Sequence, residues 1–128
     1  MILKRIKQRL LIHKQRKKTN SVISRKCILN DETILEGHNK IGQVNISSCT
    51  IGYATYVLSG NLSNGVVGKF CSIGNNVRIV DATHPIDYVS SFPGFYLTEN
   101  KSIFLAKNKI KITEHLLCSN GKSFVVGN

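Results

Sequence analysis

Aliphatic side chains recur at every sixth position in the middle of the chain. Three contiguous blocks of six span residues 67–84 and open with Val67, Ile73 and Ile79, and their fifth positions hold Cys71, Val77 and Thr83. A fifth residue and the first residue of the next block lie two apart, so both point to the same side of a strand. Short strands at this period predict a solenoid whose coils stack and bury a continuous core.

Looser copies of the block precede these three. Residues 51–56 fit the pattern fully, whereas residues 41–46 keep only its opening. A glycine after the aliphatic residue suits a bend in the chain. The alternative is a β-sandwich, whose strands usually recur every 8–12 residues. The period of six favours the solenoid, with Cys49 and Cys71 as small core residues.

The first residues follow a helical period instead. Ile2, Leu3, Ile6 and Leu10 fall on one face of a helix over residues 2–18, and cations fill much of the rest. One interpretation is a solvated helix that packs on the body through this thin apolar stripe. The other is an amphipathic helix at an anionic membrane surface.

From Pro85 to about Ser123 the period of six disappears. This stretch is rich in aromatic residues and then alternates lysines with isoleucines over residues 107–112. So long an excursion from a solenoid is more often functional than idle. The period resumes at the end of the chain, where residues 124–128 match residues 66–69 in character.

The 128 residues suit one domain, and the charge is concentrated at one end of it. Lys and Arg number 18 against 7 acids, and residues 1–26 contain ten of these cations and no acid. This basic segment contains no aromatic residue for stacking on bases, and the remainder is nearly neutral, so nucleic-acid binding is not expected.

No apolar run is long enough to span a membrane, and no secretory signal is evident, so we expect a cytoplasmic protein.

The four cysteines form no CxxC pair, and His115 with Cys118 is a weak metal signal by itself. We therefore expect no metal cofactor. Reduced cysteines in a cytoplasmic protein are the simplest interpretation.

The run over residues 67–79, then His84-Pro85, then Ser90-Ser91-Phe92-Pro93-Gly94-Phe95-Tyr96, resembles the hexapeptide-repeat acyltransferases. The combination is similar to their xenobiotic acetyltransferase branch, which includes O-acetyltransferases of capsule and lipopolysaccharide assembly. The resemblance covers roughly residues 28–128. It implies an all-β solenoid that is a left-handed parallel β-helix, here with a short basic N-terminal helix and a long loop excursion.

The resemblance also implies a homotrimer that uses acetyl-CoA as donor and a hydroxyl of an acceptor, expected to be a sugar, bound between subunits. The catalytic histidine of the family corresponds to His84. Its imidazole would act as general base on the acceptor hydroxyl as that oxygen attacks the thioester carbonyl. His13, His38 and His115 match nothing in the family and are expected to be surface residues.

The aromatic loop resembles the acceptor-site loop of the family. Its Tyr88, Phe95 and Tyr96 are candidates for acceptor contacts, with packing against the solenoid or a neighbouring subunit as the equal alternative. Tyr53 and Tyr56 are further candidates, since family members often place acceptor contacts in such a block. Their third and sixth places predict that both point outward.

Family members usually continue beyond the position of Asn128, with coils that form most of the acetyl-CoA cleft. We therefore expect residues 1–20 to be a basic amphipathic helix and residues 21–128 to be an incomplete β-helix domain with its excursion at 85–123. The residues that contact acetyl-CoA are expected mostly beyond Asn128, and such a chain alone would be a poor catalyst.

The leading hypothesis is an O-acetyltransferase, or the N-terminal part of one, that acts on a cell-surface polysaccharide or its precursor. The basic residues 1–20 would suit peripheral contact with the inner face of the membrane. The alternatives are an antibiotic O-acetyltransferase and a catalytically inert solenoid that only binds or assembles.

Overall fold

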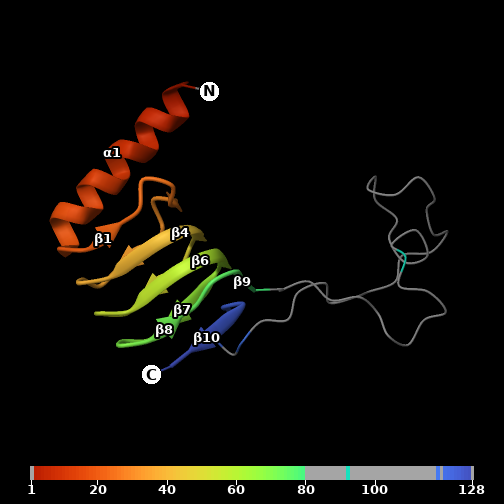
Figure 1. Cartoon of the computed structure of the whole chain (residues 1–128). Helices are drawn as coiled ribbons and strands as arrows, with labels where there is room; N and C mark the ends of the chain where they lie inside the picture. Colours follow the sequence, from red (N-terminus) through yellow and green to blue (C-terminus); the bar gives the residue numbers. More distant parts are fainter. Residues whose placement is uncertain (1, 80–91, 93–117, 119, 128) are drawn as a thin grey trace. The chain divides into compact units, whose positions relative to one another are not determined.

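The computed structural model describes residues 2–79, 92, 118 and 120–127. The chain divides into one unit of Met1–Val80 with Leu117–Asn128 and a second of Asp81–Leu116. The description below concerns the first unit, which contains one helix and short parallel strands (Figure 1). The elements in chain order are α1 (Ile2–Thr19), β1 (Val22–Ile23), β2 (Ile28–Leu29), β3 (Ile34–Leu35), β4 (Lys40–Ser47), β5 (Thr50–Ile51), β6 (Tyr56–Ser63), β7 (Gly65–Val67), β8 (Ser72–Ile73), β9 (Val77–Arg78) and β10 (Phe124–Val126).

The strands stack in parallel at a nearly constant spacing along the chain. Val22 pairs with Lys40, Lys40 with Tyr56, and Tyr56 with Ser72. Each coil is therefore about 16–18 residues long, which is three blocks of about six. The predicted all-β solenoid with a basic N-terminal helix is confirmed.

Each coil has three faces. The first face contains β1, the start of β4, the start of β6, and β8. The second contains β2, the ends of β4 and β6, and β9. The third is a separate sheet in the order β10-β7-β5-β3. These faces enclose the core, and Figure 1 shows α1 at one end of the stack with β8 and β10 at the other.

The core consists of columns of aliphatic side chains, one from each face. Their members are buried in successive coils: Ile23, Ile41 and Val57; Leu29, Ile46 and Leu62; Leu35, Ile51 and Val67. Cys49 and Ile51 both point inward, as the pattern predicted, and Cys71 and Ile73 pack against the same core. The period of six thus marks the inward positions of this solenoid.

Two strands are longer than the short strands that the period predicts. β4 and β6 each continue across the corner between the first and second faces, and their register resumes there after Gly42 and Leu58. Gly60 allows this in β6, because its φ is +138° and a Cβ there would lie 2.0 Å from the Val77 carbonyl oxygen. The close approach of the next coil explains why glycine occupies that position.

The corner between the third and first faces is polar inside. Asn39 and Thr55 are 1% and 0% exposed, and their side chains bind backbone rather than each other. Asn39 Nδ2 donates to the Gly52 carbonyl at 2.6 Å, and Thr55 Oγ1 donates to the Gly68 carbonyl at 2.6 Å. Among the described residues, no buried side-chain nitrogen or oxygen lacks a hydrogen-bond partner. These side chains therefore hold the turn in place as a structural network.

The chain returns to the solenoid at β10 in register with the third coil. Val125 pairs with Val66 and Val126 with Val67, which is the match that the sequence predicts. Phe124 fills the space beside Gly65, where a Cβ would lie 1.9 Å from its ring. Residues 80–123 are thus inserted between the second and third faces of the fourth coil.

The helix α1 covers the first coil, but not through the stripe that the sequence suggested. Ile12 is 4% exposed and belongs to the core, whereas Leu3 and Leu10 are 82% and 65% exposed. The interpretation that the stripe packs on the body is therefore wrong. Helical spacing explains the outcome, because Gln8, Ile12 and Thr19 lie on the side opposite Leu3 and Leu10.

Candidate functional site

The predicted catalytic and acceptor residues fall in two groups. His84, Tyr88, Phe95 and Tyr96 lie outside the described residues, so they stay predictions from the sequence. Tyr53 and Tyr56 are described, and each is 39% exposed on the outside of the solenoid. Their predicted outward orientation is confirmed, and their role toward an acceptor stays a prediction.

Tyr53 belongs to a row of rings on the outer side of one corner. Its ring centroid lies 5.2 Å from that of His38 in the preceding coil and 6.0 Å from that of Phe70 in the next. His38 and Phe70 occupy equivalent turns, with φ of +52° and +55°. The equivalent position in the coil between them is Ala54, and Tyr53 precedes it by one residue, so its ring lies between those of His38 and Phe70. Tyr53 thus has ring neighbours that the sequence did not predict.

Tyr56 lies on β6 at the first face. It pairs through its backbone with Lys40 and Ser72 in the adjacent coils. The described residues thus place Tyr53 at a corner and Tyr56 on the face that follows it.

Asn64 anchors the chain at the corner to which the excursion returns. Its side-chain Nδ2 lies 3.3 Å from the Gly121 carbonyl oxygen and 3.3 Å from Ser123 Oγ. The Ser123 N–H donates to the Asn64 carbonyl at 2.7 Å. The residue has a φ of +51°, a conformation that asparagine adopts more readily than most residues. Asn64 therefore fixes where the chain returns from the segment that contains His84.

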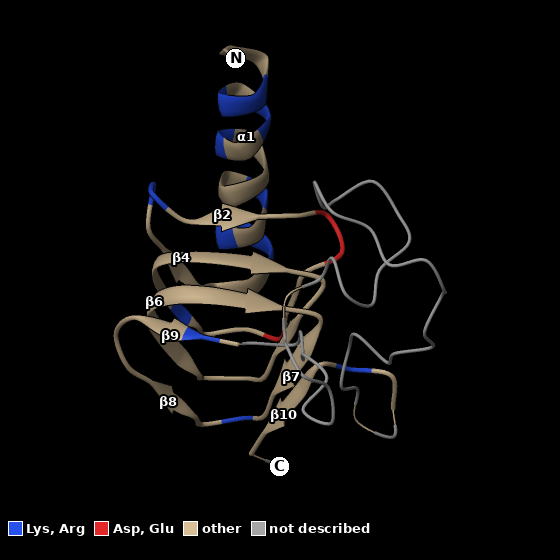
Figure 2. Cartoon of the chain, turned by 90° about the vertical axis from the view of Figure 1, so that its right-hand side faces the viewer, with Lys and Arg blue, Asp and Glu red and all other residues tan. Residues whose placement is uncertain are grey.

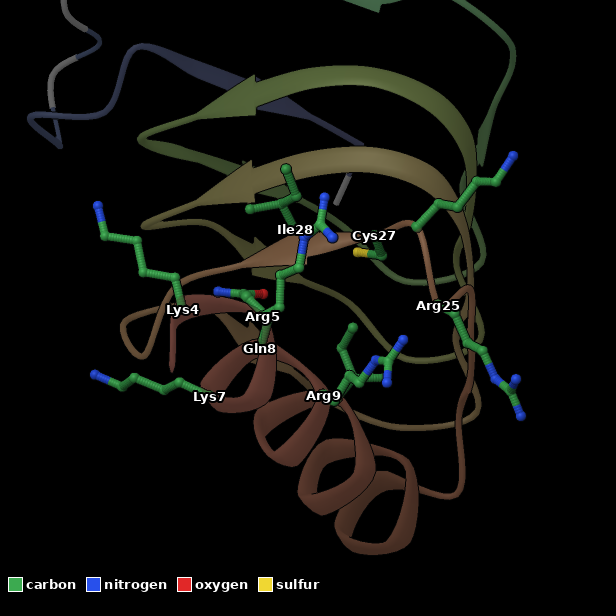
Figure 3. Close-up of a pocket in the computed structure, with 10 residues that line it drawn as sticks. Lys4, Arg5, Lys7, Gln8, Arg9, Arg25, Cys27 and Ile28 are labelled. Carbon is green, nitrogen blue, oxygen red and sulfur yellow. The ribbon is translucent and has the colours of Figure 1, made fainter. Parts of the chain in front are cut away.

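A groove lies between α1 and the loop that leads into β2, with a volume of about 690 Å³ (Figure 3). Most of the residues that line it are cationic, the others are uncharged, and none is acidic: Lys4, Arg5, Lys7, Gln8, Arg9, Ile12, Arg25, Lys26, Cys27 and Ile28. In Figure 3, Arg5 points toward Ile28, whereas Lys7 and Arg25 extend outward. The outward positions of Lys7 and Arg25 are typical of a solvated junction. The positive charge of the lining would favour an anion over a cation in the groove.

Cys27 borders this groove but lacks the chemistry of a nucleophile. It is 3% exposed, and burial raises the pKa of its thiol from 9.0 to about 12. A hydrogen bond with the backbone of Val44 opposes this shift without cancelling it. Because the thiolate is the reactive form, Cys27 is an inert core residue near neutral pH.

Neither metal chemistry nor membrane spanning is indicated in the described part of the chain. Those residues contain no group of three or more His, Cys, Asp and Glu side chains that could hold a metal ion. They also include no helix with enough apolar length to cross a bilayer.

Sequence reasoning missed the side of α1 that binds the solenoid. That side combines Gln8, Leu11, Ile12 and Thr19, of which Leu11 is partly buried against the core. The sequence did contain a signal, because Gln8, Leu11, Ile12, Gln15 and Thr19 follow one another at helical spacing and none is a cation. The more hydrophobic Leu3, Ile6 and Leu10 obscured it.

The sequence matches no protein-family model, and neither a curated protein nor a solved structure matches the chain.

Proposed function

We propose that this protein is an acetyl-CoA-dependent O-acetyltransferase, or the N-terminal part of one, that acts on a sugar hydroxyl. The observation that carries the proposal is the parallel solenoid with coils of 16–18 residues and one long segment inserted at a corner of the fourth coil. That segment contains His84-Pro85 and the aromatic run to Tyr96, which resemble the acceptor side of hexapeptide-repeat acyltransferases.

In the proposed reaction, the His84 imidazole accepts the proton of the acceptor hydroxyl as its oxygen attacks the thioester carbonyl of acetyl-CoA. The tetrahedral intermediate then collapses, the C–S bond breaks, and the proton returns from the imidazolium to the CoA thiolate. A histidine suits both steps because its ordinary pKa lies near neutral pH. General base catalysis of this kind contributes about 10²–10⁴-fold to the rate.

The candidates for contact with the acceptor are aromatic side chains, Tyr88, Phe95 and Tyr96 in the inserted segment and Tyr53 and Tyr56 on the coils, each taken by itself. Exposed rings suit the apolar faces of sugars. The family resemblance further implies a homotrimer with the acceptor between subunits. A lipid-linked sugar at the inner face of the membrane fits the basic α1 better than an antibiotic does.

The test is transfer of labelled acetyl from acetyl-CoA to a panel of hydroxyl acceptors by the full protein. The panel contains polysaccharides, lipid-linked sugar precursors and hydroxyl-bearing antibiotics. We expect labelled sugar, and we expect His84→Ala to lower the rate by about 10²–10⁴-fold. His115→Ala is the matched control, because it changes the other histidine after residue 80 and should leave the rate unchanged.

Full activity of a correctly assembled His84→Ala protein would remove His84 from the mechanism. Transfer to the antibiotics alone would select the xenobiotic substrate class instead. No transfer to any acceptor, with the protein folded, would reject the enzyme and leave a solenoid that only binds or assembles.

A further inference from the structure

The outer face of α1 is apolar and uncovered. Ile2, Leu3, Ile6 and Leu10 are 73%, 82%, 49% and 65% exposed. Residues three and four apart are neighbours on a helix, so Leu3, Ile6 and Leu10 form one continuous line. Exposed aliphatic side chains are common singly, but a line of them along one helix marks an interaction surface.

The solenoid holds α1 so that this face cannot turn inward. Gln8 exchanges two hydrogen bonds with the backbone of Leu29, and the Arg16 guanidinium donates to the Ile23 carbonyl. Between them Ile12 is buried in the core. Three successive turns are thus fixed on the inner side, which orients Leu3, Ile6 and Leu10 away from the solenoid.

Cations border the apolar line along its whole length. Lys7 and Lys14 lie on one side of it, Arg9 lies on the other, and Lys17 follows its end. The helix contains no acid, and Figure 2 shows Lys and Arg gathered along α1, with few on the coils. The ion pair between Lys7 Nζ and Asp31 Oδ2, at 3.5 Å, is exposed at both ends and offsets little of this charge.

We propose that the outer face of α1 binds the surface of an anionic phospholipid bilayer, with the helix axis parallel to the membrane plane. Leu3, Ile6 and Leu10 enter the boundary between headgroups and acyl chains, and the bordering cations contact anionic headgroups. Charge complementarity selects this occupant over a second α1, since two such helices would bring eight cations against eight.

This membrane contact goes beyond the proposed acetyltransferase activity and does not depend on it. It would fix the N-terminal end of the solenoid against the membrane. An acceptor carried on a lipid would then diffuse in the plane to which the protein is bound.

The experiment is flotation of the full protein with vesicles of phosphatidylcholine alone or mixed with phosphatidylserine. We expect the protein to float much more with the mixed vesicles than with phosphatidylcholine alone, since the neutral lipid leaves only the apolar contact. The triple variant Leu3→Gln/Ile6→Gln/Leu10→Gln keeps good helix formers on α1 and should lose at least about tenfold in the bound fraction. The variant Arg9→Gln/Lys14→Gln/Lys17→Gln keeps Arg16, whose guanidinium donates to the Ile23 carbonyl, and should lose about fivefold for each cation removed.

Ile34→Gln is the matched control, because Ile34 is 58% exposed on the third face and should not affect flotation. Circular dichroism checks that every variant keeps its fold. Salt at about 1 M, where the Debye length is about 3 Å, should release only part of the wild-type protein, since the apolar contact persists.

Three results would overturn the proposal. Wild-type protein that stays at the bottom with mixed vesicles has no membrane contact of this kind. Equal flotation by the triple glutamine variant would mean that charge alone is responsible. If sedimentation shows self-association that the same triple variant abolishes without vesicles, the face binds a second copy.

Discussion

The side-chain amide of Gln8 pairs with the backbone of Leu29 as a neighbouring strand would. Its Nε2 donates to the Leu29 carbonyl at 2.6 Å, and its Oε1 accepts from the Leu29 N–H at 3.1 Å. Leu29 belongs to β2, whose strand partner β4 lies on the other side. One glutamine of α1 thus satisfies backbone groups at the edge of the first coil, where unpaired groups would invite association with another strand.

Replacing Gln8 should therefore cost stability. Gln8→Ala removes both hydrogen bonds and leaves the Leu29 backbone beneath the helix, so we expect a loss of about 1–3 kcal/mol in the free energy of unfolding. Urea unfolding followed by circular dichroism measures it. Lys14→Ala, an exposed change on the same helix, should alter stability by less than about 0.5 kcal/mol. Equal stability of the two variants would show that Gln8 does not cap β2.

A methyl group at position 65 should displace β10. The Cβ of Gly65→Ala would lie 1.9 Å from Cε1 of Phe124, a ring with little freedom to move in the core. We expect a cost of about 1–3 kcal/mol and faster hydrogen exchange at Val125 and Val126.

Two variants separate this clash from a general effect of alanine. Gly74→Ala places its Cβ where no atom lies within 4 Å, so it should be nearly neutral. Phe124→Leu should reduce the cost of Gly65→Ala, and the coupling in a double-mutant cycle measures the contact. Additive effects of the two substitutions would contradict the packing described for β10.

The stability of the solenoid should fall at alkaline pH because of Cys27. Its folded pKa of about 12 exceeds its ordinary 9.0, so above about pH 9 the unfolded chain loses a proton that the folded chain keeps. Cys27 then destabilises the fold by about 1.4 kcal/mol for each pH unit between 9 and 12. Below pH 9 it has no such effect.

The measurement is urea unfolding at several pH values from neutral to alkaline. Cys27→Ala should flatten the alkaline decline relative to wild type. Cys118→Ser is the control, since Cys118 is exposed and should leave the slope unchanged. If Cys27→Ala and wild type decline in parallel, the thiol is not the group responsible.

Much of the fold was predictable because the period of six reports directly on which side chains face inward. The pairs Cys49–Ile51 and Cys71–Ile73 followed from it, and so did the register of Val125 and Val126 against the third coil. The outward orientation of Tyr53 and Tyr56 followed from the same count. These features are repeats of one local rule, and a repeat is visible in a single sequence.

Features that depend on contacts between distant segments could not be predicted in this way. In the sequence, Gln8 is one polar helix residue among several, because its role depends on the edge of β2. Ile12 lies on a side of the helix that is less apolar than the side of Leu3 and Leu10. The buried amide of Asn39 and the ring row around Tyr53 likewise need the coil length to be known. The role of His84 rests on the family resemblance alone.

The corner that Asn64 occupies has a consequence for how this protein can change over time. In the third coil, residue 64 alone connects β6 to β7 at this corner. In the fourth coil, β9 ends at Arg78 and β10 begins at Phe124, and β10 still pairs with β7. Because the cost of closing a loop rises only slowly with its length, the inserted segment can be lengthened, shortened or exchanged at little expense to the coils. The stability of the coils is thereby largely independent of the inserted segment, and the same frame can hold segments of quite different sequence.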